Sequence, residues 1–277
     1  MTMAIYVPSL GRSNDIGWGV PRFASPALRA RMIYVVPEGE GASYLNALDQ
    51  AGVSYPGLGD ARVLECPERG IAKTRLWIGA HASGTGADKF LMLDDDIWFY
   101  TRKSFDKENL DYSEPGQVNA MISSVEEHLD HYGHVGISAR EGNNRLGVGD
   151  HSLKAENTRT LRALAYRTND FLECEHGRVE VMEDFDVNLQ LLEKGIPNCN
   201  LAFWSQGQRQ TNAPGGCSTY RSHEVQDASA RRLAELHPGI VRLRQKENKS
   251  GGEFGHRTEV TIMWKKAYEQ GLRSRGA

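Results

Sequence analysis

The sequence lacks several features that would each mark a particular class of protein. No apolar run approaches the ~18 residues of a membrane span, and the N-terminus lacks the basic and apolar segments of a signal peptide. The four cysteines form no C-x-x-C pair, so neither a zinc knuckle nor a disulfide framework is indicated. They are Cys66, Cys174, Cys199 and Cys217. We therefore expect a cytoplasmic protein with reduced, mostly buried thiols and no membrane partner.

The composition is that of an ordinary folded domain. Of the 277 residues, 39% are hydrophobic and 25% are charged, which excludes the disordered and fibrous classes. The length suits one α/β domain with a decorated end. The formal net charge of -3 conceals an asymmetry, because residues 205–277 carry 13 Lys and Arg against 7 Asp and Glu. This basic quarter indicates a polyanionic partner, or simply a solvated charged surface.

Four short apolar runs predict buried strands. They are residues 4–8, 32–36, 61–64 and 90–93. Proline ends or follows each of the first three runs, which marks the end of a strand. Between the last two lies a helical pattern at 71–82, with Ile71, Leu76, Ile78 and Ala82 available for one face. Alternating strands and helices predict an α/β fold with a mostly parallel central sheet and flanking helices.

Further elements are expected downstream. Helices are predicted at 117–132, from Glu183 to Gly195, and at 222–237. The first is the most clearly marked, because its apolar residues recur at i, i+3, i+4 and i+7 and Gly133 follows as a stop. Residues 199–204 predict a strand leading into a polar loop. Residues 258–264 allow strand or helix, because their β-branched content and their apolar spacing disagree.

The strongest chemical signal is the run F-L-M-L-D-D-D-I-W-F at residues 90–99. Its apolar part brings Asp94, Asp95 and Asp96 to the C-terminal end of a strand, where open α/β sheets bind ligands. Three adjacent anions repel one another unless a cation neutralises them, and a hard divalent ion that bridges to phosphates meets this requirement. We therefore predict that Asp96 binds a metal. The alternative is an acidic surface turn.

Two other enzyme classes have comparable features. Haloacid-dehalogenase phosphatases place Thr or Val after their aspartates, usually following the first strand, whereas Ile97 and Trp98 stand here after about the fourth. Sugar nucleotidyltransferases need an N-terminal glycine-rich loop with Arg, which residues 8–20 match only loosely. Both classes are therefore disfavoured.

A second acidic motif is V-E-V-M-E-D-F-D at residues 179–186. It places Glu183, Asp184 and Asp186 at the start of an amphipathic helix, where free N–H groups and the helix dipole favour carboxylates. These acids could serve only as helix caps. Alternatively, one of them removes the proton from an acceptor hydroxyl as it attacks a sugar carbon.

The order of these features resembles that of GT-A glycosyltransferases: a proline-ended first strand with Arg12, the segment G-I-A-K-T-R at 70–75, the aspartate triplet and the Glu-Asp helix. More narrowly, the segments 212–226 (N-A-P-G-G-C-S-T-Y-R-S-H-E-V-Q) and 256–268 (H-R-T-E-V-T-I-M-W-K-K-A-Y) resemble the TET-associated glycosyltransferases of phages. The resemblance covers most of the chain. It implies one GT-A domain over 1–277, with a nucleotide-sugar-binding half at 1–115 and an acceptor-side half at 116–277.

The resemblance also implies roles for individual residues. The triplet would form the donor site, with Asp94 near the ribose or base, Asp95 beside it, and Asp94 and Asp96 on Mn²⁺ or Mg²⁺. His256 would complete the metal shell, with His223 as second choice. Asp184, or its neighbour Glu183, would be the base of an inverting transfer. Arg12, Lys73 and Arg75 suit the nucleotide or its diphosphate, and Gly215, Gly216, Tyr220 and Arg221 suit an acceptor loop.

For this family the implied acceptor is the hydroxymethyl group of 5-hydroxymethylcytosine in DNA, in a phage-infected bacterial host. UDP-glucose and UDP-N-acetylglucosamine rank first as donors. Two alternatives remain open at this point: the same site acting on a protein, lipid or saccharide, and a non-catalytic DNA-binding protein. Salt dependence separates a DNA acceptor from a neutral one, because phosphate contacts weaken steeply with salt.

Overall fold

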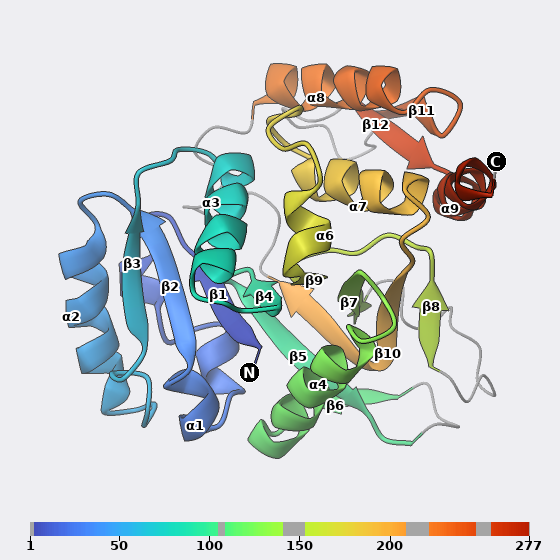
Figure 1. Cartoon of the computed structure of the whole chain (residues 1–277). Helices are drawn as coiled ribbons and strands as arrows, with labels where there is room; N and C mark the ends of the chain where they lie inside the picture. Colours follow the sequence, from blue (N-terminus) through green and yellow to red (C-terminus); the bar gives the residue numbers. More distant parts are fainter. Residues whose placement is uncertain (1–2, 105–108, 141–152, 209–221, 248–255, 277) are drawn as a thin grey trace.

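The computed structural model describes residues 3–104, 109–140, 153–208, 222–247 and 256–276. Within these residues, ten strands form one sheet and two form a separate ribbon (Figure 1). The strands of the sheet are β1 (Ala4–Pro8), β2 (Met32–Pro37), β3 (Arg62–Cys66), β4 (Lys89–Leu93), β5 (Ile97–Arg102), β6 (Leu110–Tyr112), β7 (His134–Ala139), β8 (Lys154–Glu156), β9 (Ala163–Arg167) and β10 (Asn198–Gln208). The ribbon pairs β11 (Val241–Glu247) with β12 (His256–Ile262).

The sheet is mixed, which corrects the expectation of a mostly parallel one. Its order is β3-β2-β1-β4-β9-β7-β10-β5-β6, with β8 also paired to β10. The four strands predicted from the apolar runs, β1 to β4, are indeed parallel. Beyond them, β9 runs antiparallel to both β4 and β7, and β5 runs antiparallel to β10. The direction of β9 depends on a long-range pairing that the apolar pattern of its own residues does not encode.

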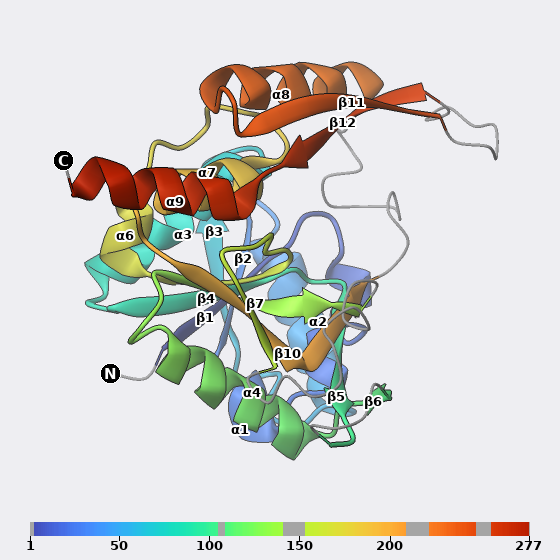
Figure 2. The same cartoon turned by 90° about the vertical axis from the view of Figure 1, so that its right-hand side faces the viewer.

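Helices cover both faces of the sheet (Figure 2). They are α1 (Pro26–Arg29), α2 (Gly41–Gly52), α3 (Ile71–Gly84), α4 (Pro115–His128), α6 (Thr168–Leu172), α7 (Glu183–Glu193), α8 (His223–Leu236) and α9 (Trp264–Arg275). Helix α4 packs on one face, and α3, α6 and α7 on the other. None of the described helices is long and apolar enough to cross a membrane.

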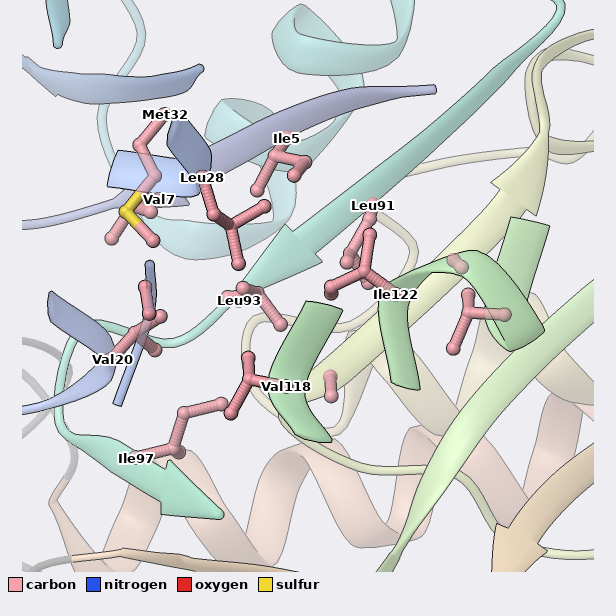
Figure 3. Close-up of a cluster of buried hydrophobic side chains, with 14 of the residues drawn as sticks. Ile5, Val7, Val20, Leu28, Met32, Leu91, Leu93, Ile97, Val118 and Ile122 are labelled. Carbon is pink, nitrogen blue, oxygen red and sulfur yellow. The ribbon is translucent and has the colours of Figure 1, made fainter. Parts of the chain in front are cut away.

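Side chains along β4 alternate between the two faces of the sheet and pack against different helices on each face. Leu91 and Leu93 point into a cluster that includes Val118 of α4, as Figure 3 shows. Phe90 and Met92 point to the opposite face and pack with residues of α3, α6 and α7. Because successive side chains of a strand alternate between faces, Asp94 continues the row of Phe90 and Met92. The end of β4 therefore presents its first carboxylate toward α3 and α7.

The helix predictions hold with two corrections. Helix α4 begins at Pro115 with a capping box between Glu114 and Gln117, and it ends at His128, one turn earlier than expected. Helix α3 spans the predicted residues, and Ile78 and Ala82 of the predicted apolar face are buried, but Leu76 is 37% exposed, which corrects that face in part. The buried face also includes an arginine and consists of Ala72, Arg75, Ile78, Gly79 and Ala82.

The C-terminal elements form a third cluster beside α7. Helix α8 confirms the prediction for residues 222–237. The segment that allowed strand or helix is strand up to Ile262 and helix from Trp264. Buried residues of α8, α9 and the ribbon pack against Leu189 and Leu192 of α7. These contacts fix α7, and with it the acidic motif at its start.

Candidate active site

The aspartate triplet occupies the turn between β4 and β5, as the sequence predicted. This turn lies at the carboxyl end of β4, beside the ends of the parallel strands β1 and β2. The backbone N–H of Asp94 donates to the carbonyl oxygen of Arg162 at 2.9 Å, which ties the turn to the residue before β9. The first carboxylate thus has a fixed position in the sheet.

Arg75 joins the two acidic motifs. Its Nη2 lies 3.2 Å from Oδ1 of Asp94, and its Nη1 lies 2.5 Å from Oε1 of Glu183. The side chain comes from the buried face of α3 and is 9% exposed. One guanidinium therefore holds the end of β4 and the start of α7 together, so the two acidic motifs contact the same cation.

The environment of Asp94 disfavours its negative charge. Burial raises the pKa of Asp94 to about 7, and Arg75 opposes this shift, whereas the nearby carboxylates of Asp96, Asp95 and Asp184 add to it. Burial and three like charges thus outweigh the guanidinium. A further cation at this point would favour the ionised form of Asp94.

Arg12 neutralises the other two aspartates. Its Nη1 lies 2.5 Å from Oδ1 of Asp95 and 3.1 Å from Oδ2 of Asp96. Ser9 Oγ donates to the second oxygen of Asp95 at 2.5 Å and lies 2.7 Å from the hydroxyl of Tyr44. Because both oxygens of Asp95 bind protein groups, the geometry favours a positioning role for Asp95 over the direct donor contact expected from the sequence.

The three cations expected at the diphosphate are placed differently. Arg12 and Arg75 each lie against carboxylates of the site. Lys73 is exposed, and because residues two apart on a helix point about 200° apart, it faces away from Arg75. Lys73 and Arg75 therefore do not face one ligand together, and only the two arginines lie in the site.

The acids at the start of α7 have separate surroundings. The N-cap residue is Met182, in the left-handed region at φ 67° and without a side-chain capping bond, so neither Glu183 nor Asp184 is the N-cap. Glu183 pairs with Arg75. Asp186 is 2% exposed and binds Arg178 and His237. Asp184 is half-buried, accepts from the N–H of Phe185 at 3.0 Å, and lines a hollow together with Arg75 and Glu183.

A second hollow lies beside the triplet and was not predicted. Its lining includes Arg12, Trp18, Tyr34 and the carboxylates of Asp95 and Asp96. Tyr34 is 1% exposed, and its hydroxyl lacks a hydrogen-bond partner among the described residues. In the sequence, Tyr34 is simply one member of an apolar strand, so no local signal distinguishes it. A buried hydroxyl without a partner favours a polar ligand group in this hollow.

Several predicted site residues cannot be placed. Gly215, Gly216, Tyr220 and Arg221 lie outside the described residues. His256 begins β12 and pairs with Glu247, but its side chain is not among those described. His223 is the half-buried first residue of α8. Among the described side chains, no three or more His, Cys, Asp or Glu are grouped so that they alone could hold a metal ion.

Comparison with known families decides the class of this protein. Residues 3–216 match the model of the family described as TET-Associated Glycosyltransferase. The chain belongs to this family. It is a glycosyltransferase with an α/β sheet and flanking helices, which confirms the family resemblance seen in the sequence. The matched region contains the triplet, Arg75 and the start of α7. No curated protein matches the sequence.

Three solved structures illustrate what the chain is similar to. The mannosyltransferase PcManGT from Pyrobaculum calidifontis, solved with GDP-Man and Mn²⁺, is 13% identical with a TM-score of 0.49 over 85% of this chain and 62% of its own. The inositol-1-phosphate CTP transferase from T. maritima is 13% identical, with a TM-score of 0.41 over 86% and 98%. The mannose-1-phosphate geranyltransferase from Thermus thermophilus is 18% identical, with a TM-score of 0.30 over 50% and 42%. The chain thus spans less than two thirds of the first and third structures.

Proposed function

We propose that this glycosyltransferase transfers a sugar from a uridine-diphosphate-linked donor, with glucose or N-acetylglucosamine as the sugar, to the hydroxymethyl group of 5-hydroxymethylcytosine in DNA. It would act in the cytoplasm of a phage-infected bacterium. The observation that carries the proposal is the bridge from Asp94 through Arg75 to Glu183. It joins the aspartate triplet to a set of potential bases in a member of this family.

The residues fit a divalent cation bound together with a diphosphate. Asp94 and Asp96 supply hard oxygen ligands, and Asp94 is held where a further cation would relieve its charge. Because the described side chains alone do not group into a metal site, a Mn²⁺ or Mg²⁺ ion here would take further ligands from the substrate phosphates. When bound, the ion would neutralise charge on the leaving diphosphate. His256 or His223 remains our proposal for a histidine ligand.

Asp184 is our candidate for the base. Protonation of Glu183 would break its 2.5 Å ion pair with Arg75. Protonation of Asp186 would disrupt a buried network with Arg178 and His237. Asp184 is held by neither of these ion pairs, and it lines the hollow beside the triplet region. It is therefore the acid best suited to accept the proton of the attacking hydroxyl, in a single inverting displacement.

The charge of the C-terminal quarter supports a polyanionic acceptor. Exposed basic side chains are distributed over the ribbon and α9: Arg242, Arg244, Lys265, Lys266, Arg273 and Arg275. Arg232 of α8 is 53% exposed as well. Such residues attract DNA phosphates at long range, independently of sequence.

Salt dependence of transfer tests the acceptor. Rates are measured with one donor on hydroxymethylated DNA, on unmodified DNA and on a neutral oligosaccharide, at about 50 and about 200 mM salt. We expect transfer only to hydroxymethylated DNA, with a KM that rises steeply with salt. Transfer to the oligosaccharide with a salt-independent KM would instead establish a saccharide acceptor. Absence of transfer to DNA with every donor would refute the proposal.

A further inference from the structure

A continuous stack of planar side chains lies at the β5–β6 edge of the sheet. The ring of Phe23 stacks on Tyr112 with centroids 5.9 Å apart, and Tyr112 stacks on Tyr100 at 4.8 Å. The guanidinium of Arg140 lies over the ring of Tyr100, 4.3 Å from its centroid. Tyr112 is 62% exposed, and Arg140 is exposed as well. We call Phe23, Tyr112, Tyr100 and Arg140 the aromatic stack.

The backbone is shaped to make this stack. Gly207 of β10 pairs with Trp98, and a Cβ at Gly207 would lie 2.8 Å from Trp98 Nε1 and 3.2 Å from Cε2 of Tyr100. The missing side chain lets both rings lie close across β10. Trp98 Nε1 then donates to the hydroxyl of Tyr100 at 2.7 Å, which fixes the Tyr100 ring. Arg140 follows β7 on the other side of β10 and reaches across it to this ring.

The aromatic stack borders the candidate active site. Ile97 and Phe99 point into the α4 cluster, so Trp98 and Tyr100 lie on the opposite face of the sheet. This is also the face toward which Asp94 points. Trp98 further contacts Trp18, with ring centroids 5.2 Å apart, and Trp18 lines the hollow beside Asp95 and Asp96.

We infer that the aromatic stack binds an unpaired nucleobase of the acceptor DNA, next to the base that receives the sugar. The nucleobase stacks on the outer plane of the Arg140 guanidinium, which Tyr100 supports from the inner side. A planar cation suits this partner because it stacks on a base and also attracts the neighbouring phosphates. A neutral saccharide would gain nothing from the positive charge. The inference rests on the proposed DNA acceptor and deepens it by requiring DNA with an unstacked base.

Arg140→Lys is the decisive variant, because it keeps the charge and loses the stacking plane. Binding of a single-stranded oligonucleotide with one 5-hydroxymethylcytosine is titrated alongside binding of UDP-glucose. We expect DNA affinity to fall by about 5- to 140-fold, the loss typical of one base–aromatic stack, with donor affinity unchanged. Arg62→Lys is the matched control, since Arg62 is exposed on β3 at the opposite edge of the sheet. It should bind DNA as the wild type does.

An abasic oligonucleotide locates the contact. Removing the base next to the target should weaken wild-type binding, but it should have little further effect on Arg140→Lys. The inference is overturned if Arg140→Lys binds DNA within twofold of the wild type. It is also overturned if removing the base weakens DNA binding equally in the wild type and in Arg140→Lys. Transfer by the wild type is measured in parallel. If the wild type modifies DNA and Arg140→Lys binds DNA as tightly, only the role of the aromatic stack is rejected. If the wild type transfers sugar only to a saccharide, the proposed function itself is rejected.

Discussion

Arg75 and Glu183 lie 108 positions apart in the sequence and form an ion pair of 2.5 Å. The same guanidinium reaches Asp94 at the end of β4. Three elements, α3, β4 and α7, therefore meet at one buried cation. This junction places a potential base near the triplet before any substrate binds.

Arg75→Met should strongly destabilise the protein. The substitution preserves much of the side-chain volume but leaves Asp94 and Glu183 as partly buried like charges. Removing one partner of a buried ion pair costs about 3–5 kcal/mol. Urea denaturation of metal-free protein measures the loss. The double variant Arg75→Met with Glu183→Gln should lose less than the sum of the two single variants, since it removes the uncompensated charge; strict additivity would show that the pair is not coupled.

Asp184→Asn should lower turnover by about 10²–10⁴-fold, because that is the usual contribution of a positioned base. Donor binding should be spared, since the substitution keeps the size of the side chain and its acceptor for the N–H of Phe185. Single-turnover rates and donor titrations separate the two effects.

Glu183→Gln is the matched control for that variant. It alters the neighbouring acid, which Arg75 already holds, and should therefore affect stability more than turnover. A turnover loss in Glu183→Gln that matched or exceeded that of Asp184→Asn would transfer the role of base to Glu183. Retention of the donor's anomeric configuration in the product would exclude a single displacement.

The buried His237 predicts a pH dependence of stability. Burial alone would lower the pKa of His237, but hydrogen bonds to Asp186 and Glu193 outweigh it and the net shift is upward. The stabilisation that His237 adds to the folded state is thus complete below the ordinary histidine pKa of about 6.5, and it is lost as the pH rises through the raised pKa. The difference in unfolding free energy between wild type and His237→Gln should therefore shrink from about pH 6 to about pH 9.

His134 acts in the opposite sense and must be separated from this effect. Burial lowers the pKa of His134 to about 4, so the fold loses stability as the pH falls below about 6.5. Wild type and His237→Gln both contain His134, so its effect cancels in the difference between their unfolding free energies. A difference in unfolding free energy between wild type and His237→Gln that grew with pH would contradict the raised pKa of His237.

Gly207→Ala should disturb the aromatic stack. The added Cβ would meet Trp98 Nε1 at 2.8 Å, so the indole must shift, at an expected cost of about 1–3 kcal/mol. Tryptophan fluorescence and urea denaturation report the two effects. Gly84→Ala at the end of α3 is the control, since a Cβ there would have no heavy atom of the surroundings within 4 Å. Equal behaviour of the two variants would show that Gly207 is not needed for the packing of Trp98.

The sequence predicted those elements whose boundaries are marked locally. The strands ending in proline or aspartate, and the helices stopped by glycine, are present in the structure. Strand β9 was missed, because its place between β4 and β7 depends on partners distant in the chain. The face of α3 was predicted only in part, for a related reason: a buried arginine, Arg75, occupies a position where apolar periodicity predicts a hydrophobic residue, because its carboxylate partners lie on other elements.

The candidate site was predictable in composition but not in connectivity. Consecutive acidic residues after an apolar strand can be recognised in the sequence, and so can acidic residues at the start of a helix. The sequence suggested that Arg12 binds a diphosphate, but in the structure Arg12 pairs with Asp95 and Asp96. This pairing depends on the three-dimensional path of the loop after β1, which the sequence alone does not reveal. The pairing of Trp98 with Gly207 likewise requires the register of β5 against β10.

The most direct test of the account is mass spectrometry of the modified nucleoside. Hydroxymethylated DNA is incubated with Mn²⁺ and a panel of sugar nucleotides, using wild type and Asp96→Ala at saturating donor. We expect a hexose or N-acetylhexosamine on 5-hydroxymethylcytosine with the wild type and none with Asp96→Ala, whose circular dichroism spectrum should be that of the wild type. Full activity of a folded Asp96→Ala protein, or wild-type protein that leaves the DNA unmodified with every donor, would contradict the account.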